Sequence, residues 1–194
     1  MEKLTVNNNS HDMKVSELID MFIRSCQCSN LSDYTISYYK RCFKSFGKFF
    51  NLDSPCSSIN LETIESYIFY LKEQGNINDI TINTNLRGMR ALLYFAMERG
   101  YLKRFKIKLI KAQKKVKETY TDEELDILLK KSDIKKCSFA EYRNWVIINY
   151  LLATGNRLET MSKIKIGDID FVSQEIVLKN TKNSKQYIIP YYIR

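Results

Sequence analysis

The chain has 194 residues, 44% of them hydrophobic, which is enough for one or two domains with hydrophobic cores. It contains no run of about 18 apolar residues and its N-terminus is polar, so we expect a cytoplasmic protein that does not enter a membrane. The five cysteines form no C-x-x-C pair and the single histidine, His11, lies in the polar N-terminus. These features argue against a disulfide framework, a zinc site and histidine-based catalysis.

The net charge of +9 is concentrated in one segment. Residues 1–102 hold 11 basic and 11 acidic side chains, residues 118–194 hold 12 and 11, and residues 103–117 hold 8 basic and none acidic. Such a run is often a solvated linker, but it can also bind nucleic acid, with an affinity that falls as salt rises. Its basic residues are Lys103, Arg104, Lys106, Lys108, Lys111, Lys114, Lys115 and Lys117.

The first half of the chain predicts a helical bundle. Residues 1–13 lack apolar periodicity, and we expect them to be disordered. Amphipathic periodicity with short connections favours a four-helix unit over residues 14–102. The helices are predicted at residues 15–26, 33–50, 61–74 and 81–99, with Ser32 capping the second and Asn60 the third.

Two sets of apolar residues define the expected core of this bundle. In the third helix Leu61, Ile64, Ile68 and Leu71 should face inward. The second helix carries an aromatic stripe at helical spacing, which we interpret as core and not as a surface for stacking bases. This stripe consists of Tyr38, Tyr39, Phe43, Phe46, Phe49 and Phe50.

The second half, residues 118–194, predicts a mixed α and β unit after a basic linker over residues 103–117. Thr121 and Glu124 form a capping box for a helix to about residue 131. A second helix starts at Ser138 and ends at Gly155, a third covers residues 158–163, and residues 175–179 and 185–189 alternate as hairpin strands around a turn at residues 180–184. The expected core residues of the first two helices are Leu125, Leu128, Leu129, Trp145, Val146, Ile148, Leu151 and Leu152.

Arg157 follows directly after the predicted end of a helix. Gly155 can adopt a positive φ without a Cβ clash, so it suits a helix C-terminus and could direct Arg157 into the corner before the next helix. A guanidinium in such a corner can bind a phosphate through two hydrogen bonds. An arginine in this position is otherwise a solvated or salt-bridged surface residue.

The stretch from Tyr150 to Pro190 resembles the first active-site box of the tyrosine recombinases, or phage integrases. It contains T-G-x-R at residues 154–157, G-D-I-D at 167–170, T-K-x-x-K at 181–185 and I-P at 189–190. The resemblance implies that Arg157 is the first of two arginines that clamp the scissile phosphate and that Lys182 is the general acid. It also implies a mechanism without metal or cofactor, because the arginines supply the positive charge.

The two segments LSDYTISYYKRCFKSFGKFF and DITINTNLRGMRALLYFAMERGYL resemble helices of the recombinase core-binding domain. That domain forms one half of a clamp around DNA, so the resemblance implies double-stranded DNA and other recombinase protomers as partners. The implied fold is mainly α: a four-helix core-binding bundle, the basic linker and an incomplete α+β catalytic domain with a β-hairpin. Phosphate contacts are then expected from Lys40, Lys44, Lys48, Arg87 and Arg90, together with the basic run.

The sequence departs from the family pattern in two ways. Thr160 occupies the position where the family commonly places an acid, and Glu159 lies about 100° away around the helix. No second arginine box and no downstream tyrosine follow the hairpin, and Tyr191 and Tyr192 stand too close to the strand for the nucleophile. We therefore expect a chain that binds DNA but does not cleave it alone.

Three hypotheses follow for the function. The first is the DNA-binding N-terminal portion of a site-specific tyrosine recombinase or integrase. The alternative is a non-enzymatic DNA-binding regulator derived from an integrase. In the third, the bundle is a protein-interaction module and the basic run is a tether.

Overall fold

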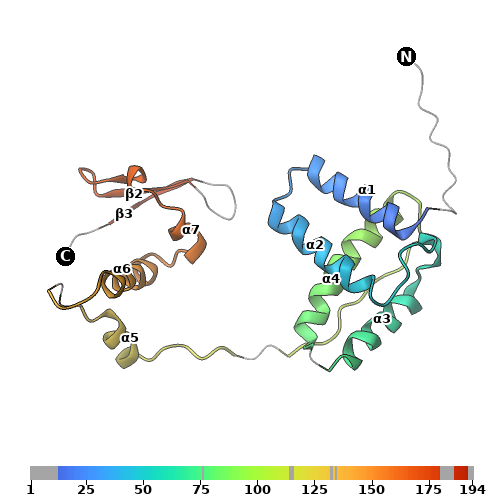
Figure 1. The fold of residues 1–194 in the computed structure, drawn as a ribbon, viewed down its shortest axis with the longest axis horizontal. Helices are drawn as coiled ribbons and strands as arrows, with labels where there is room; N and C mark the ends of the chain where they lie inside the picture. Colours follow the sequence, from blue (N-terminus) through green and yellow to red (C-terminus); the bar gives the residue numbers. More distant parts are fainter. Residues whose placement is uncertain are drawn as a thin grey trace, which may run out of the picture. The chain divides into compact units, whose positions relative to one another are not determined.

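The computed structural model describes residues 13–75, 77–113, 116–131, 133, 135–179 and 186–191. The chain divides into two compact units, Met1–Val116 and Lys117–Arg194. The first is helical and the second combines helices with a small antiparallel sheet, which confirms the expected fold class (Figure 1). None of the helices in the described residues is both long and apolar enough to cross a membrane.

Unit 1 contains the four predicted helices. Ser32 accepts a hydrogen bond from the Thr35 amide and Asn60 accepts one from the Thr63 amide, so both predicted caps are confirmed. The fourth helix begins before its predicted start because Asn78 caps it by accepting a 2.8 Å hydrogen bond from Thr81. The helices are α1 (Val15–Cys28), α2 (Asp33–Phe46), α3 (Leu61–Glu73) and α4 (Asp79–Glu98), with a short 3-10 turn, η1 (Cys56–Ser58).

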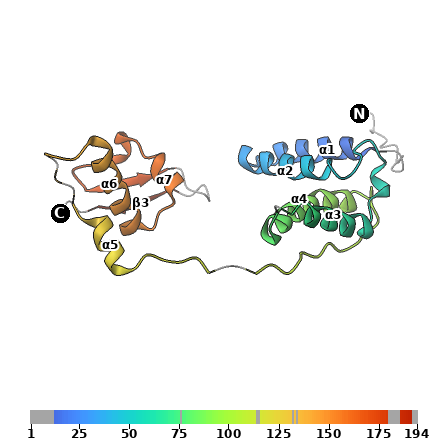
Figure 2. The same cartoon turned by 60° about the horizontal axis from the view of Figure 1, so that its bottom comes forward.

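The core of unit 1 is built around α4, which packs against each of the other three helices. Figure 2 shows α1 and α2 on one side of this bundle and α3 and α4 on the other. The aromatic stripe is core, as predicted: Phe43 and Phe46 are buried, and the other four rings pack against the same cluster. The prediction for Leu61 is wrong, because this first residue of α3 is 43% exposed beyond the end of the core.

Helix α2 ends at Phe46 and not at residue 50 as predicted. Gly47 follows it, and 3-10-type hydrogen bonds from Lys48 and Phe49 tighten the turn. The turn folds the next two rings back over the bundle: Phe50 stacks on Phe46 at 5.2 Å, and Phe49 lies 5.5 Å from Tyr67. The aromatic contacts thus outweigh one further turn of helix.

Helices α2 and α4 approach closely at Gly88. A Cβ built there would lie 2.6 Å from the Cβ and Sγ of Cys42, so only glycine fits. Nearby, the Tyr38 hydroxyl donates a 2.8 Å hydrogen bond to the carbonyl of Thr84. Burial and the adjacent Cys42 raise the pKa of Tyr38 to about 12, so the hydroxyl remains a donor at neutral pH.

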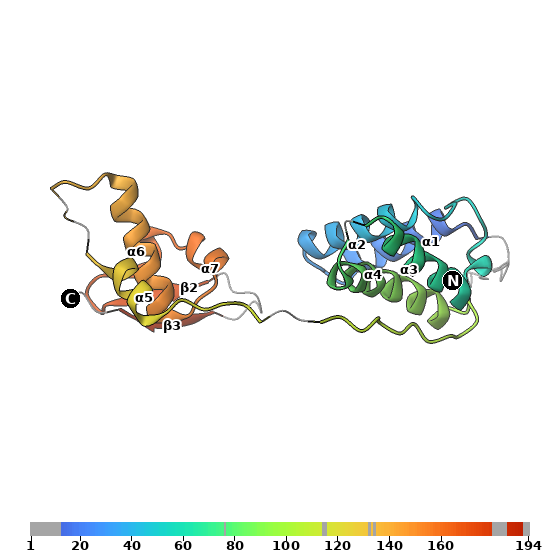
Figure 3. The same cartoon turned by 90° about the horizontal axis from the view of Figure 1, so that it is seen from below.

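The described residues of unit 2 form three α-helices and three strands. Thr121 and Ser138 cap the first two helices through reciprocal bonds with Glu124 and Glu141, which confirms both predicted starts. The strands form a sheet in the order β1-β2-β3, on one side of α5 and α6 (Figures 1 and 3). The two-residue strand β1 was not predicted, and the predicted turn at residues 180–184 lies outside the described residues. The elements are α5 (Asp122–Leu129), α6 (Phe139–Thr154), α7 (Leu158–Ser162), the 3-10 turn η2 (Ile166–Asp168), β1 (Ile169–Asp170), β2 (Glu175–Leu178) and β3 (Tyr187–Pro190).

The predicted core of α5 and α6 is not buried in the described part of unit 2. Leu128 is 37% exposed, Val146 45% and Leu152 51%. Neither helix has a fully buried residue, because their described neighbours cover only part of their circumference. The remaining residues of the prediction are half-buried: Leu125, Leu129, Trp145, Ile148 and Leu151.

Candidate nucleic-acid interface

One face of α4 carries two of the predicted cations. Asn83, Arg87, Arg90 and Tyr94 are spaced i, i+4, i+7 and i+11, so they lie in one line along the helix. Arg87 is exposed and Arg90 is half-buried. Neither forms an ion pair with a described residue, so both guanidinium groups are available to an external anion.

The segment that follows α4 lies against the same unit. We call residues 103–111 the basic strap; Ile107 is 2% exposed and joins the core, while Phe105 and Leu109 are half-buried. The side chains between them point outward, so apolar and basic residues alternate along an extended chain. The exposed cations of the strap are Lys103, Arg104, Lys106, Lys108 and Lys111.

The predicted lysines of α2 lie on another face. Lys40 and Lys44 are exposed and one helical turn apart, opposite the side of α2 that packs on α4 at Cys42. Lys48 is exposed in the turn after the helix. The described part of the chain gives none of the three an ion pair, but the structure does not place them in line with Arg87 and Arg90.

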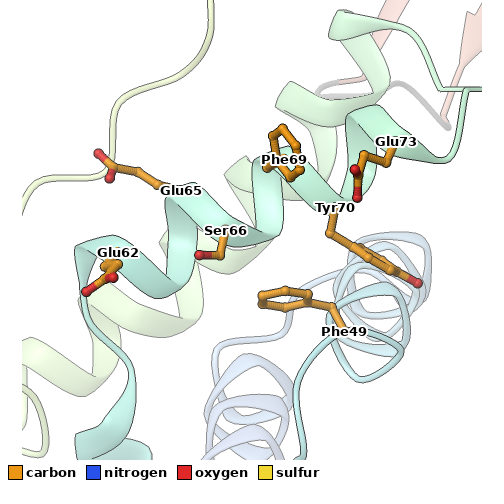
Figure 4. A pocket seen from close by; sticks show the side chains of 7 residues that line it. All are labelled: Phe49, Glu62, Glu65, Ser66, Phe69, Tyr70 and Glu73. Carbon is orange, nitrogen blue, oxygen red and sulfur yellow. The ribbon is translucent and has the colours of Figure 1, made fainter.

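Helix α3 presents the opposite charge. A shallow depression of about 470 Å³ lies along its outer face, next to the turn after α2 (Figure 4). Its glutamates have no ion pair with a described residue, and Phe69 is 64% exposed at its edge. The negative charge of this face would repel a phosphate backbone. Unit 1 therefore carries negative charge on α3 and positive charge on α4 and the strap. The depression is lined by Phe49, Glu62, Glu65, Ser66, Phe69, Tyr70 and Glu73.

The corner at Arg157 has the predicted geometry. Gly155 ends α6 with φ 62°, and its amide donates to the carbonyl of Leu151 at 2.9 Å. The Asn156 side chain donates a 3.0 Å hydrogen bond to the hydroxyl of Tyr150, which fixes the corner from the other side. Arg157 is the N-cap of α7; its backbone carbonyl accepts the first helical bonds, while its side chain is exposed.

The two positions Glu159 and Thr160, which follow Arg157, do not supply an acid next to the arginine. Thr160, which stands where the family commonly has an acid, is buried, with 8% of its surface exposed. Glu159 points to solvent and pairs with Lys163 at 2.8 Å, and this hydrogen bond lowers the pKa of the carboxyl group. Glu159 therefore does not replace the missing acid.

A second carboxylate, which the sequence did not single out for a role, is held inside unit 2. Asp168 is 8% exposed; it accepts hydrogen bonds from Lys179 and from the Lys165 amide, and the hydrogen bond from Lys179 is the main reason its pKa is lowered. It links η2 to the end of β2. Asp168 lies within the quoted G-D-I-D motif, which is the signal that could have identified it.

Three predicted site residues lie outside the described residues: Lys114, Lys115 and Lys182. The remaining cations of the prediction, including Lys117, are exposed or half-buried. The described residues contain no group of three or more histidine, cysteine, aspartate or glutamate side chains that could hold a metal ion. All five cysteines are free thiols.

A four-helix unit with uncompensated cations, followed by an arginine corner in a unit of helices and a small sheet, is the arrangement expected of the integrase class. The sequence model of the phage integrase SAM-like domain matches residues 15–116, more than half of the chain. The chain therefore belongs to the phage integrase family of tyrosine recombinases.

Relatives and solved structures agree with this assignment. The tyrosine recombinase XerC of Bacillus pumilus is 27% identical over 180 residues, covering 90% of this chain and 58% of the relative. XerC of Bacillus subtilis is 26% identical over 183 residues, covering 91% of this chain and 59% of the relative. The chain thus spans less than two thirds of the length of these relatives.

The fold is shared with solved integrases. A lambda integrase tetramer bound to a Holliday junction superposes with a TM-score of 0.73 at 13% identity, covering 97% of this chain and 54% of that one. The Tn1549 transposon integrase in complex with circular intermediate DNA gives 0.67 at 21% identity, covering 92% and 59%. At these identities the likeness concerns the fold alone.

Proposed function

We propose that this chain is the DNA-binding N-terminal portion of a site-specific tyrosine recombinase. The observation that carries the proposal is the set of exposed or half-buried cations along α4 and the basic strap, none of which is neutralised by a described carboxylate. Outside residues 103–117 the chain is nearly charge-balanced, so this excess is local. We call Arg87, Arg90 and the cations of the basic strap the cationic strip. A local excess of positive charge of this kind suits binding to a phosphate backbone.

Double-stranded DNA and other recombinase protomers are the proposed partners. The lambda integrase structures contain a dimer on a core site and a tetramer on a Holliday junction, and this chain shares their fold. Within this proposal residues 14–102 form the core-binding domain, residues 103–117 the linker and residues 118–194 an incomplete catalytic domain. Within this proposal the chain works in the cytoplasm, where a bacterial recombinase meets chromosomal or mobile DNA.

The proposed roles in unit 2 follow from the chemistry of strand cleavage. Arg157 would neutralise the developing charge on the scissile phosphate, and Lys182 would protonate the leaving 5′ oxygen. The first role is supported by the exposed side chain of Arg157, which forms no ion pair with a described residue. Within this proposal the role of these 194 residues is DNA binding.

A salt titration of duplex binding tests the proposal. Each phosphate neutralised contributes about 0.9 to the slope of log affinity against log salt. Replacing the five exposed strap cations by glutamine should therefore reduce the slope by roughly 4 to 5. The matched control replaces Lys130, Lys131 and Lys135, which are exposed but outside the strip. Equal slopes for the strap variant and the wild type would refute the proposal.

A nicked suicide substrate tests the second part of the proposal. The intact chain should bind this DNA in low salt without forming a covalent protein-DNA adduct. The measurement is a denaturing gel of labelled substrate after incubation. An adduct formed by these 194 residues would overturn the assignment of a binding role without cleavage.

A further inference from the structure

Asn83 is a buried polar side chain whose bonds leave its own helix. It is 5% exposed and lies on α4. Its amide nitrogen donates a 2.9 Å hydrogen bond to the carbonyl of Ile110, and its amide oxygen accepts a 3.0 Å bond from the Ile110 amide. The side chain thus pairs with the strap backbone as a neighbouring β-strand would, and only an amide offers this donor and acceptor side by side.

A second anchor lies further along the same face of α4. The Ile107 amide donates a 3.4 Å hydrogen bond to the Tyr94 hydroxyl, and the Ile107 side chain is buried in the core of unit 1. Because Tyr94 is near the C-terminal end of α4 and Asn83 near its N-terminal end, the strap runs back along the helix. Figures 2 and 3 show this yellow-green segment extending along the bundle.

The anchors fix the spacing of the strap cations. In an extended chain, alternate side chains are about 6.6–6.8 Å apart. Arg104, Lys106 and Lys108 occupy alternate exposed positions. Arg87 and Arg90 lie between the two anchor residues on α4.

We propose that Asn83 is a positioning residue that holds the basic strap in an extended, DNA-ready conformation beside the arginines of α4. This inference rests on the proposed DNA-binding function and adds that the strap is ordered before DNA arrives. Ordering a free segment on binding would cost conformational entropy for each residue fixed. Asn83 removes that cost although it carries no charge and touches no phosphate.

Amide hydrogen exchange in the absence of DNA tests the clamp, by which we mean the two hydrogen bonds between the Asn83 side chain and the Ile110 backbone. In Asn83→Ala the Ile110 amide should exchange at least about tenfold faster than in the wild type, because its acceptor is gone. The amides of Leu86 and Leu93 within α4 should keep their protection. An Ile110 amide that stays equally protected in the variant would overturn the clamp, whatever the DNA measurements give.

Duplex binding tests what the clamp does. Asn83→Ala should weaken the affinity about tenfold while leaving the salt slope unchanged, because the same cations still meet the same phosphates. Lys106→Gln is the contrasting variant and should reduce the slope by about 1. Unchanged affinity in Asn83→Ala, despite faster exchange at Ile110, would overturn the positioning role. Absence of salt-dependent binding in the wild type would refute the proposed function and this role with it, while the exchange result would still decide the clamp.

Two further variants guard against a general loss of stability. Tyr94→Phe removes the hydroxyl that accepts the hydrogen bond of the Ile107 amide and keeps the ring, so it tests the same inference if Asn83→Ala fails to fold. It should weaken duplex binding about tenfold, also without a change in slope. Ile64→Val removes one methyl group from the core at α3 and leaves both anchors of the strap in place, so the Ile110 exchange and the DNA affinity should stay unchanged.

Discussion

Arg157 owes its exposure to the backbone around it. Gly155 takes a left-handed conformation, which turns the chain at the end of α6, and the next residue, Asn156, is held by two local hydrogen bonds. The corner is therefore fixed by groups other than the guanidinium. Because the guanidinium of Arg157 does not hold the corner together, it can bind an external phosphate without a cost to the stability of the fold.

This separation makes a direct prediction for Arg157→Ala. The free energy of unfolding should change by less than about 0.5 kcal/mol, as expected for an exposed side chain that forms no ion pair with a described residue. Duplex affinity should fall about fivefold to tenfold, and the salt slope should fall by about 1. Calorimetry and a salt titration measure the two effects.

Lys163→Ala is the matched control for this variant. Lys163 is a cation in the same region, but it pairs with Glu159 and has no proposed phosphate. Its loss should leave the salt slope unchanged. Equal effects of the two substitutions on DNA binding would contradict a specific role for Arg157.

Asp168 gives unit 2 a predictable dependence on pH. Its folded-state pKa lies below the ordinary value of 3.8, chiefly because of the hydrogen bond from Lys179. A depressed pKa means that the carboxylate stabilises the fold above about pH 4 and that this stability is lost as the pH falls through the folded-state pKa. The wild type should therefore melt above Asp168→Asn at pH 7, and the difference should shrink as the pH falls below about 4 and through the folded-state pKa.

Thermal melts of both proteins across this range measure the effect. Asp126→Asn, at an exposed position of α5, serves as the comparison for removal of a carboxylate as such. A difference between wild type and Asp168→Asn that does not shrink as the pH falls below about 4 would show that the ion pair is not its source.

At the scale of elements, α4 organises unit 1. It packs against the three other helices, and its remaining face carries the strap anchors and two arginines. One helix therefore forms part of the core and also positions the cationic strip. Its contact with α2 at Gly88 is the tightest constraint on this arrangement.

Gly88→Ala should destabilise unit 1 by about 1–3 kcal/mol, since the added methyl must displace Cys42 and with it the packing of α2 on α4. Chemical denaturation of the two proteins checks the magnitude. Gly167→Ala is the matched control, because nothing lies within 4 Å of a Cβ built there. A Gly88→Ala variant as stable as the control would show that the two helices can separate at little cost.

At the scale of the whole molecule, the two units differ in how much they bury. Almost the entire set of buried apolar side chains belongs to unit 1, and only Ile176 and Leu178 belong to the described part of unit 2. Large side chains of unit 2 are exposed, including Phe139 at 80% and Ile166 at 81%. Since apolar burial supplies most of the folding free energy, unit 1 should be the more stable of the two.

Hydrogen exchange of the intact chain should show this difference. Amides in the middle of α4, around Met89, should be protected at least about a hundredfold more than amides in the middle of α6, around Ile147. Residue-resolved exchange at neutral pH provides the measurement. Equal protection of the two helices would mean that the described contacts understate the stability of unit 2.

The sequence by itself determined the helices, their caps and the Arg157 corner, because these depend on interactions a few residues apart. Thr121, Ser138 and Gly155 each act within one turn of their helix, and the motif from Tyr150 to Pro190 is likewise local. The charge excess at residues 103–117 is also a property of the chain alone.

Tertiary structure decided the features that depend on contacts between distant residues. The end of α2 depends on Phe49 and Phe50, whose rings fold back on Tyr67 and Phe46. The exposure of Val146 and Leu152 depends on which described elements pack against α6. The bond between Asn83 and Ile110 joins residues 27 positions apart, and nothing in the spacing of either residue indicates it. A basic run reads as a linker in sequence; the amide that holds it against α4 is visible only in the fold.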